Sequence, residues 1–93
     1  MSYKDQEAIM GRQIAAARTL LALSQNDLAA AAAISVPTLK RMEASEGMAS
    51  GMPNNVRAVR AALEAAGIEF IPENGGGAGV RFRMRADGTR DEH

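Results

Sequence analysis

The stretch from Ser24 to Glu43, Ser-Gln-Asn-Asp-Leu-Ala-Ala-Ala-Ala-Ala-Ile-Ser-Val-Pro-Thr-Leu-Lys-Arg-Met-Glu, decides the fold of this 93-residue chain. Ser24 and Asp27 have the spacing of a capping box, in which each side chain can accept a hydrogen bond from the other residue's backbone N–H. The pattern predicts a helix that begins at Ser24 and continues to about Ala32. Apolar residues recur where two packed helices need a shared core, at Leu28, Ala29, Ile34, Leu39 and Met42.

A second helix is expected directly after this one. Ser35 is a good N-cap, Pro37 is tolerated in a first helical turn, and the helix should end near Ala44. Only a three-residue turn separates the two helices, with Ala33 at the position where glycine is usual. Two short helices joined in this way must cross steeply, which leaves one side of the second helix exposed.

Two further helices are expected around this pair. An apolar stripe predicts the first, from about Asp5 to Ala22. Ser, Gly, Met and Pro residues from Ser45 to Pro53 indicate a loop, after which Asn54 or Asn55 can cap a fourth helix. Gly67 is well placed just beyond its end. The expected inner face of this fourth helix consists of Val56, Val59, Leu63 and Ala66.

The pattern then changes to strands. Residues Ile68–Pro72 and Val80–Arg85 alternate in the manner of a β-hairpin, joined by the glycine-rich segment 73–79. That segment fits neither G-x-G-x-x-G nor a Walker loop and precedes a strand, so we interpret it as a hairpin loop. The expected fold is mainly α: a four-helix domain over residues 1–67, a hairpin over 68–85, and a polar, disordered tail over 86–93.

The chain resembles the phage-repressor, or Xre-type, helix-turn-helix family. The resemblance is clear from Gln13 to Glu43 and looser in the fourth helix, and its most specific part is LSQNDLA followed by AISVPTLKRME. It implies a repressor-like helix-turn-helix fold that binds double-stranded DNA. The chain departs from the family pattern in two respects: Ala33 replaces the turn glycine, and Val36 and Pro37 replace polar side chains that commonly begin the recognition helix.

The resemblance also implies roles for individual residues. Gln25 matches a position that contacts phosphate, Lys40 is expected to meet phosphate, and Arg41 is the best candidate for a bidentate contact to guanine. Arg18 and Glu43 match a structural ion pair. The DNA-contacting set implied by the family is Gln25, Ser35, Val36, Pro37, Thr38, Lys40 and Arg41. Solvated charges on an ordinary exposed helix are the alternative interpretation of Lys40 and Arg41.

The hairpin needs a packing partner, because a two-stranded sheet alone is marginally stable in water. It could cover the fourth helix of its own chain, or its edge could pair with a second subunit. DNA-binding proteins of this class usually read two half-sites, which favours a homodimer. The side chains assigned to dimerisation are Phe70, Val80, Phe82 and Met84.

Several function classes find no support in the sequence. The chain has no cysteine and one histidine, so we expect no disulfide and no metal site. We find no catalytic constellation and no cofactor motif, so we expect neither an enzyme nor a cofactor. No apolar run is long enough to span a membrane, and the N-terminus does not resemble a signal peptide, so a cytoplasmic protein is expected.

Two function classes remain, and a third is weaker. The first is a sequence-specific transcriptional regulator, a dimeric repressor that reads the major groove. The second is an antitoxin or anti-activator whose main role is to bind another protein, and the third is an architectural DNA-binding protein. Eleven basic and eleven acidic residues give zero net charge, which at first argues against nucleic acid. Six of the eleven acids lie in the C-terminal half and offset basic residues there, so the neutral sum predicts weak non-specific attraction rather than no DNA binding.

Overall fold

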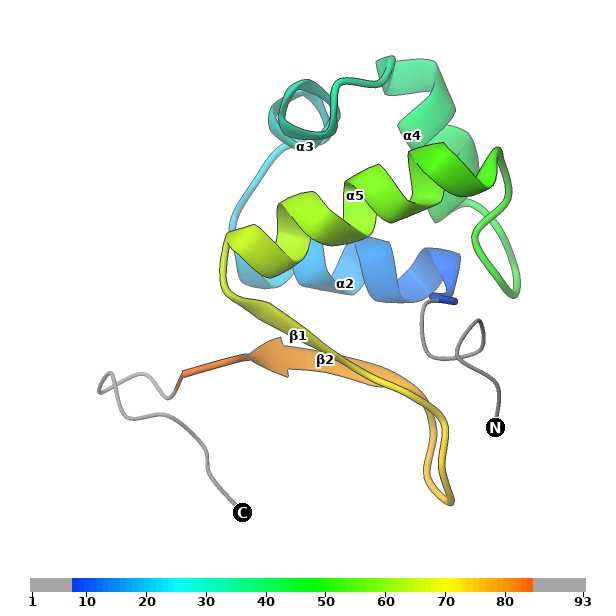
Figure 1. Ribbon diagram of the computed structural model, residues 1–93, viewed down its shortest axis with the longest axis vertical. Coiled ribbons are helices and arrows are strands. Elements are labelled where there is room, and N and C mark those ends of the chain that lie inside the picture. The colour runs from blue at the N-terminus through cyan, green and yellow to red at the C-terminus, as the bar shows by residue number, and fades with distance from the viewer. Residues whose placement is uncertain (1–7, 85–93) are drawn as a thin grey trace.

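The computed structural model describes residues 8–84, as four helices followed by an antiparallel hairpin (Figure 1). The mainly-α fold with a C-terminal hairpin is therefore confirmed. The expected tail, Arg85, and the start of the first helix at Asp5 lie outside the described residues. In chain order the elements are α2 (Gly11–Leu20), α3 (Gln25–Ala32), α4 (Val36–Glu43), α5 (Pro53–Ala65), β1 (Ile68–Ile71) and β2 (Gly79–Phe82).

Local capping sets the bounds of α3 and the start of α4, as expected. The Asp27 backbone N–H donates to Ser24 Oγ at 3.0 Å, and Asp27 Oδ2 accepts from the Ser24 N–H at 3.1 Å. At α4, Ser35 Oγ accepts from the Thr38 N–H at 3.2 Å. Each cap satisfies N–H groups that lack a partner inside the helix, which fixes where the helix begins.

The turn between α3 and α4 requires a left-handed backbone at Ala33, with φ 57° and ψ 43°. The next N–H, of Ile34, donates to Ala29 O at 3.0 Å and closes the helix end. Alanine is strained here because its Cβ approaches the following carbonyl, a contact that glycine avoids. Ala33 therefore adopts the left-handed geometry that glycine usually has at this position, and it bears the steric strain of its own Cβ.

Helix α2 is shorter than the sequence predicts. Ile9 and Met10 were expected to be helical, but they form an extended segment that bridges to the loop at Met48. The Gly11 N–H donates to Gly47 O at 3.1 Å, and a Cβ at Gly11 would collide with the carbonyl oxygen of Met42. This close approach of two backbones replaces the helical turn that the apolar stripe predicted.

The expected caps of the fourth helix are also wrong. Helix α5 begins at Pro53 with Met52 as its N-cap, so Asn54 and Asn55 lie within its first turn. Proline fits this position because its fixed φ suits the helix and its missing N–H would have no partner there. At the other end Gly67 adopts φ 110°, as its predicted place just past the helix requires.

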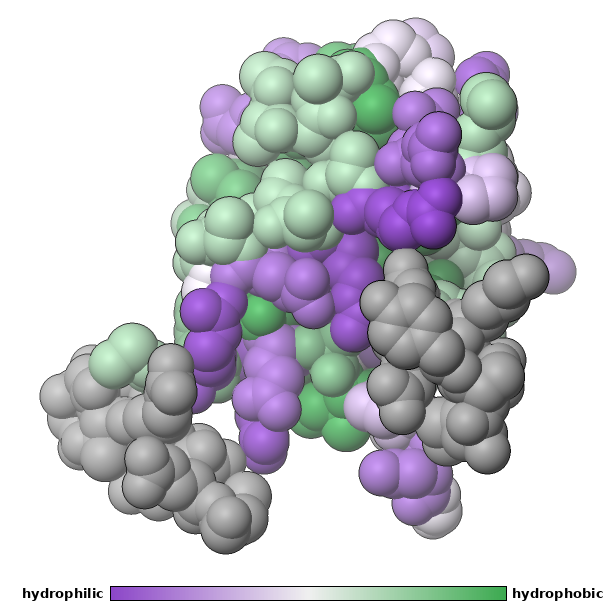
Figure 2. Space-filling model, in the orientation of Figure 1, coloured by the Kyte–Doolittle hydropathy of each residue, from purple (hydrophilic) through white to green (hydrophobic). Residues whose placement is uncertain are grey.

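Helices α2 to α5 and the inner face of the hairpin enclose one core. Ala66, predicted to face inward, is exposed because it caps α5 rather than continuing it. On the face shown in Figure 2 the surface over α3 and α5 is only weakly apolar, since its exposed side chains include alanines. The buried apolar core consists of Ile9, Ile14, Ala17, Leu28, Ala29, Ala32, Leu39, Met42, Val59, Leu63, Ile68 and Phe70.

The hairpin packs against α5 through β1 and against α2 through β2. Its strands are shorter than predicted: β1 ends before Pro72, which has no N–H to donate, and β2 ends at Phe82, opposite the first residue of β1. Gln13 of α2 fixes the hairpin's position. Its Nε2 donates to Gly79 O at 2.9 Å and to Ile71 O at 3.3 Å, while its Oε1 accepts from the Met10 N–H at 2.7 Å.

Candidate nucleic-acid interface

Helix α4 has one buried side and one exposed side. Leu39 and Met42 are fully buried, whereas Pro37, Lys40 and Arg41 are exposed. This separation follows from the helical period, because residues 39 and 42 lie on the side that meets α2 and α3. Figure 1 shows that α4 crosses α3 steeply, and the exposure of Pro37, Lys40 and Arg41 shows that this side of α4 is uncovered.

The two cations of this exposed side, Lys40 and Arg41, have no acidic partner within residues 8–84. Three other arginines form ion pairs with glutamates, whereas Arg12, Arg57 and Arg83 also have no carboxylate partner among the described residues. The ion pairs are Arg18–Glu43 at 2.9 Å, Arg60–Glu64 at 3.0 Å and Arg81–Glu69 at 3.3 Å. A helix that carries two uncompensated positive charges at its surface attracts an anionic partner.

The first turn of α4 has few polar groups left for a ligand. Ser35 Oγ holds the Thr38 N–H and shares a 2.7 Å hydrogen bond with Thr38 Oγ1. Val36 is half-buried against the core, and Pro37 has no N–H. The turn therefore presents mainly apolar contact area, and Arg41 is the strongest hydrogen-bond donor on this side of the helix.

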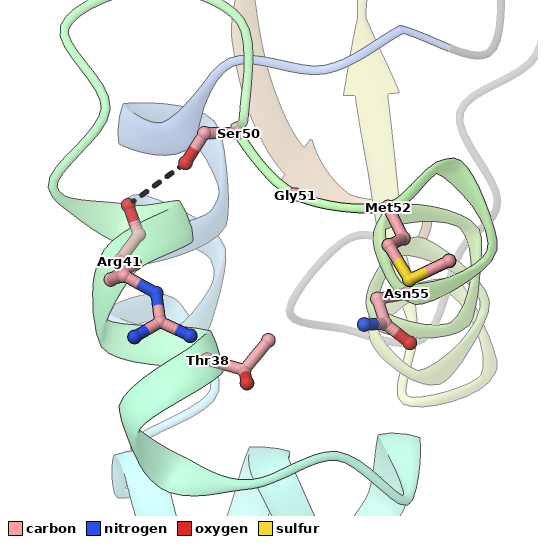
Figure 3. Close-up of a pocket in the computed structure, with 6 residues that line it drawn as sticks. All are labelled: Thr38, Arg41, Ser50, Gly51, Met52 and Asn55. Carbon is pink, nitrogen blue, oxygen red and sulfur yellow. Dashed lines mark hydrogen bonds between the residues drawn. The ribbon is translucent and has the colours of Figure 1, made fainter.

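A cleft of about 360 Å³ lies between α4 and the start of α5. Figure 3 shows Arg41 and Thr38 on the α4 wall and Asn55 on the α5 wall, with the chain between the helices closing one side. Ser50 Oγ donates to the Arg41 carbonyl at 3.4 Å. The residues that line the cleft are Thr38, Arg41, Ser50, Gly51, Met52 and Asn55.

The sequence did not predict that these residues line a cleft beside Arg41. Ser50, Gly51 and Met52 carried only the signal of a loop, and Asn55 was considered only as a cap. The loop returns beside Arg41 through hydrogen bonds that its composition did not predict: the Ser50 N–H donates to Ser45 Oγ at 3.0 Å, and Ser45 Oγ lies 3.2 Å from the Arg41 carbonyl oxygen. The two adjacent asparagines of the first α5 turn, Asn54 and Asn55, were the available signal for a polar surface there.

The expected ion pair between Arg18 and Glu43 is present and forms the centre of a larger clamp. Arg18 Nε and Nη2 donate to the two Glu43 carboxylate oxygens at 2.9 and 3.0 Å, and Arg18 Nη1 donates to Leu23 O at 3.1 Å. The hydrogen bonds to Glu43 raise the pKa of Arg18 above its usual value. The pair ties α2 to the last turn of α4 and thereby fixes the tilt of α4.

Gln25 belongs to the same clamp, which changes its expected role. Its Nε2 donates to Glu43 Oε1 at 3.1 Å, so the side chain is not free to serve a phosphate alone. An amide nitrogen has two hydrogens, and the second remains for another acceptor. Gln25 thus joins the first turn of α3 to the end of α4, a role that its sequence position did not indicate.

The four side chains assigned to dimerisation have different environments. Phe70 is 7% exposed and belongs to the core of its own chain, which removes it from any surface. Val80 packs at the edge of that core, whereas Phe82 and Met84 are 46% and 48% exposed. The hairpin is therefore first a lid on its own domain, and of these four side chains Phe82 and Met84 are the ones left exposed for a partner.

Other kinds of site find no support in the described chain. Among residues 8–84, no three His, Cys, Asp or Glu side chains lie together in a group that could hold a metal ion. Over the same range, no helix has both the length and the apolar character needed to cross a membrane.

The comparisons with known proteins add no assignment to this geometry. No model of a protein family matches the chain, and no curated protein matches it.

Proposed function

We propose that this protein is a sequence-specific transcriptional regulator that binds double-stranded DNA, and that it acts as a repressor of the phage-repressor type. The observation that carries the proposal is the exposed side of α4, where Lys40 and Arg41 lie without an acidic partner within the described chain. An α-helix of this kind fits the major groove, which is about 12 Å wide.

The side chains of α4 differ in what they offer to DNA. The Arg41 guanidinium can donate two parallel hydrogen bonds to guanine O6 and N7. Lys40 is a point charge suited to phosphate, and the second Nε2 hydrogen of Gln25 suits a phosphate oxygen near the start of α3. Val36 and the methyl group of Thr38 offer apolar contact to a thymine methyl group. The Thr38 hydroxyl forms a hydrogen bond with Ser35 Oγ, so the methyl group is the part of Thr38 that is left for this contact.

Selection of bound sites from a random pool of duplex DNA tests the proposal directly, because a regulator of this type enriches one motif. Arg41→Ala should then weaken binding to that motif by about 1–3 kcal/mol and relax base preference at one position. Arg12→Ala is the matched control, because Arg12 is also an exposed arginine but lies on α2. Enrichment of no motif, or equal effects of the two substitutions, would refute the proposal.

The proposed regulator works as a homodimer in the cytoplasm and needs no cofactor. Two copies would present two α4 helices to half-sites about 34 Å apart, or a multiple of that spacing. No enzymatic activity is proposed, and control of the regulator would come through its concentration, a partner or its operator.

The exposed apolar side chains support a second candidate function, that of an antitoxin or anti-activator that binds another protein. Pro37 at the start of α4 and Phe82 and Met84 on the hairpin are exposed, which suits a protein partner better than DNA. Co-purification of a stoichiometric partner, together with no affinity for any enriched DNA motif, would favour this candidate.

A further inference from the structure

The outer edge of β2 carries backbone groups that can pair with another strand. The Arg83 N–H donates to Gly67 O at 2.8 Å, and Glu69 lies opposite Arg81 in the register. In an antiparallel pair, residues that bond to the partner strand alternate with residues whose N–H and C=O point away from it. The groups of Val80 and Phe82 therefore point outward from the hairpin, and no hydrogen bond joins them to another element of residues 8–84.

The side chains of the same strand are incompletely covered. Phe82 lies opposite Ile68 on the inner face of the hairpin, yet Ile68 is 1% exposed and Phe82 remains nearly half exposed. Helix α5 covers the β1 side of this face, and α2 covers β2 where Gln13 binds Gly79. The apolar cover ends before Phe82 and Met84, at the end of the strand.

We propose that a second copy of this chain pairs with β2 in antiparallel fashion, with the two-fold axis beside Arg81. Val80 then lies opposite Phe82 of the second copy, and Phe82 lies opposite Val80 of the second copy. In this register each outward-facing residue of one copy lies opposite an outward-facing residue of the other copy. Each of these two residue pairs exchanges two N–H···O=C bonds, which gives four hydrogen bonds across the axis. The result is a continuous four-stranded sheet.

The side chains of the strand are compatible with this partner. On the inner face, the exposed part of Phe82 meets Val80 of the second copy, an aromatic and β-branched pair that favours cross-strand packing. On the outer face, each Arg81 is paired with its own Glu69 at 3.3 Å, so two neutral pairs rather than two bare cations meet at the axis. The same strand thus supplies both halves of the interface, as a two-fold contact requires.

This inference deepens the homodimer part of the proposed function, and its test requires no DNA. The chain has no cysteine, so Arg81→Cys gives a single thiol next to the proposed axis. Residues that face each other at such a position have Cβ atoms about 4.5–5.5 Å apart, close to the separation that a disulfide needs. Under mild oxidation the variant should become a disulfide-linked dimer as its main species.

Arg12→Cys is the matched control, because it places a single exposed thiol on α2 instead. Crosslinking of Arg81→Cys no faster than Arg12→Cys would overturn the proposal, and so would a monomeric mass of the unmodified chain in light scattering at the crosslinking concentration. A crosslinked dimer that enriches no DNA motif would instead refute the proposed function alone.

Phe82→Asp supplies an independent measurement. This side chain is half exposed, so the variant should keep its helical circular dichroism while its mass in light scattering falls from two chains to one. A folded Phe82→Asp variant that retains the mass of two chains would show that the copies meet elsewhere, and it would overturn the proposed register.

Discussion

Helix α3 and the hairpin are held in place by interactions of very different sequence range. Both ends of α3 are set from within or beside the helix, by the exchange between Ser24 and Asp27 and by the left-handed turn at Ala33. The hairpin instead takes its position from Gln13, whose hydrogen-bond partners lie 58 and 66 residues further along the chain. Substitutions in the long-range contacts should therefore lower the free energy of unfolding more than substitutions in the local caps, which act on one helix end.

The largest effect is expected at Gly11, where two backbone segments nearly touch. Gly11→Ala forces its new Cβ against the Met42 carbonyl, and backbone on both sides has to move. We expect a loss of about 3 kcal/mol in the free energy of unfolding, the upper end of the cost of overpacking. Chemical denaturation measures it, and Gly47→Ala is the control, because a Cβ there would meet nothing within 4 Å. Equal stability of the two variants would contradict the close approach.

Gln13→Leu should have the next largest effect. The substitution keeps the volume of the side chain but leaves the Met10 N–H and the carbonyls of Ile71 and Gly79 without their amide partner. We expect a loss of about 2 kcal/mol, since buried polar groups without a partner cost about 1–3 kcal/mol. Hydrogen exchange should show the hairpin opening before α3. Uniform loss of protection across the chain would contradict the role of Gln13 as the hairpin's anchor.

Ala33→Gly should stabilise the protein, by about 0.5–1 kcal/mol. Glycine removes the left-handed strain of about 1–2 kcal/mol and adds a smaller entropic cost in the unfolded chain. The control is the same substitution at Ala30, an exposed position inside α3, which should destabilise by about 0.5–1 kcal/mol. Thermal melting of the two variants compares them directly, and shifts of the same sign would argue against the turn geometry.

The smallest effect is a pH dependence at the α3 cap. Hydrogen bonds from the Ser24 backbone and then its side chain hold the pKa of Asp27 below its ordinary value of 3.8. A carboxyl with a lowered folded pKa adds stability above the unfolded value, and that stability is lost as the pH falls below 3.8 through the folded pKa. Asp27→Asn should therefore lower the melting temperature at pH 7 and change it little under strongly acid conditions. A constant difference between the two proteins at all pH values would contradict the shift.

The range of the interactions also explains which elements the sequence could predict. The start and end of α3, the start of α4 and the place of Gly67 follow from residues that contact their near neighbours, so local patterns were sufficient. The start of α2 could not be predicted in this way, because Ile9 is buried as a helical stripe would require but lies in an extended segment paired with the loop. The spacing of apolar residues indicates which residues are buried, but it does not indicate which backbone conformation they adopt.

The features of the candidate site fall into the same two groups: those that a local pattern predicts and those that depend on contacts between distant segments. The exposed positions of Lys40 and Arg41 follow from the motif between Ser24 and Glu43. The pairing of Arg18 with Glu43 joins residues 25 positions apart and was expected from the family resemblance alone. The bond between Gln25 and Glu43 and the cleft beside Arg41 depend on how separate segments meet, and the burial of Phe70 depends on α5. Strand alternation correctly placed Phe70 on the inner face but could not show that its own helices cover it.

The clamp at Glu43 has a consequence for the kinetics of any complex that α4 forms. Three donors from two side chains bind the Glu43 carboxylate, so the end of α4 is held in place before a ligand arrives. Little conformational entropy is then lost on binding, and association does not wait for a rearrangement. For the proposed complexes with DNA, differences in affinity between sequences should therefore appear in how long each complex lasts, rather than in how quickly it forms.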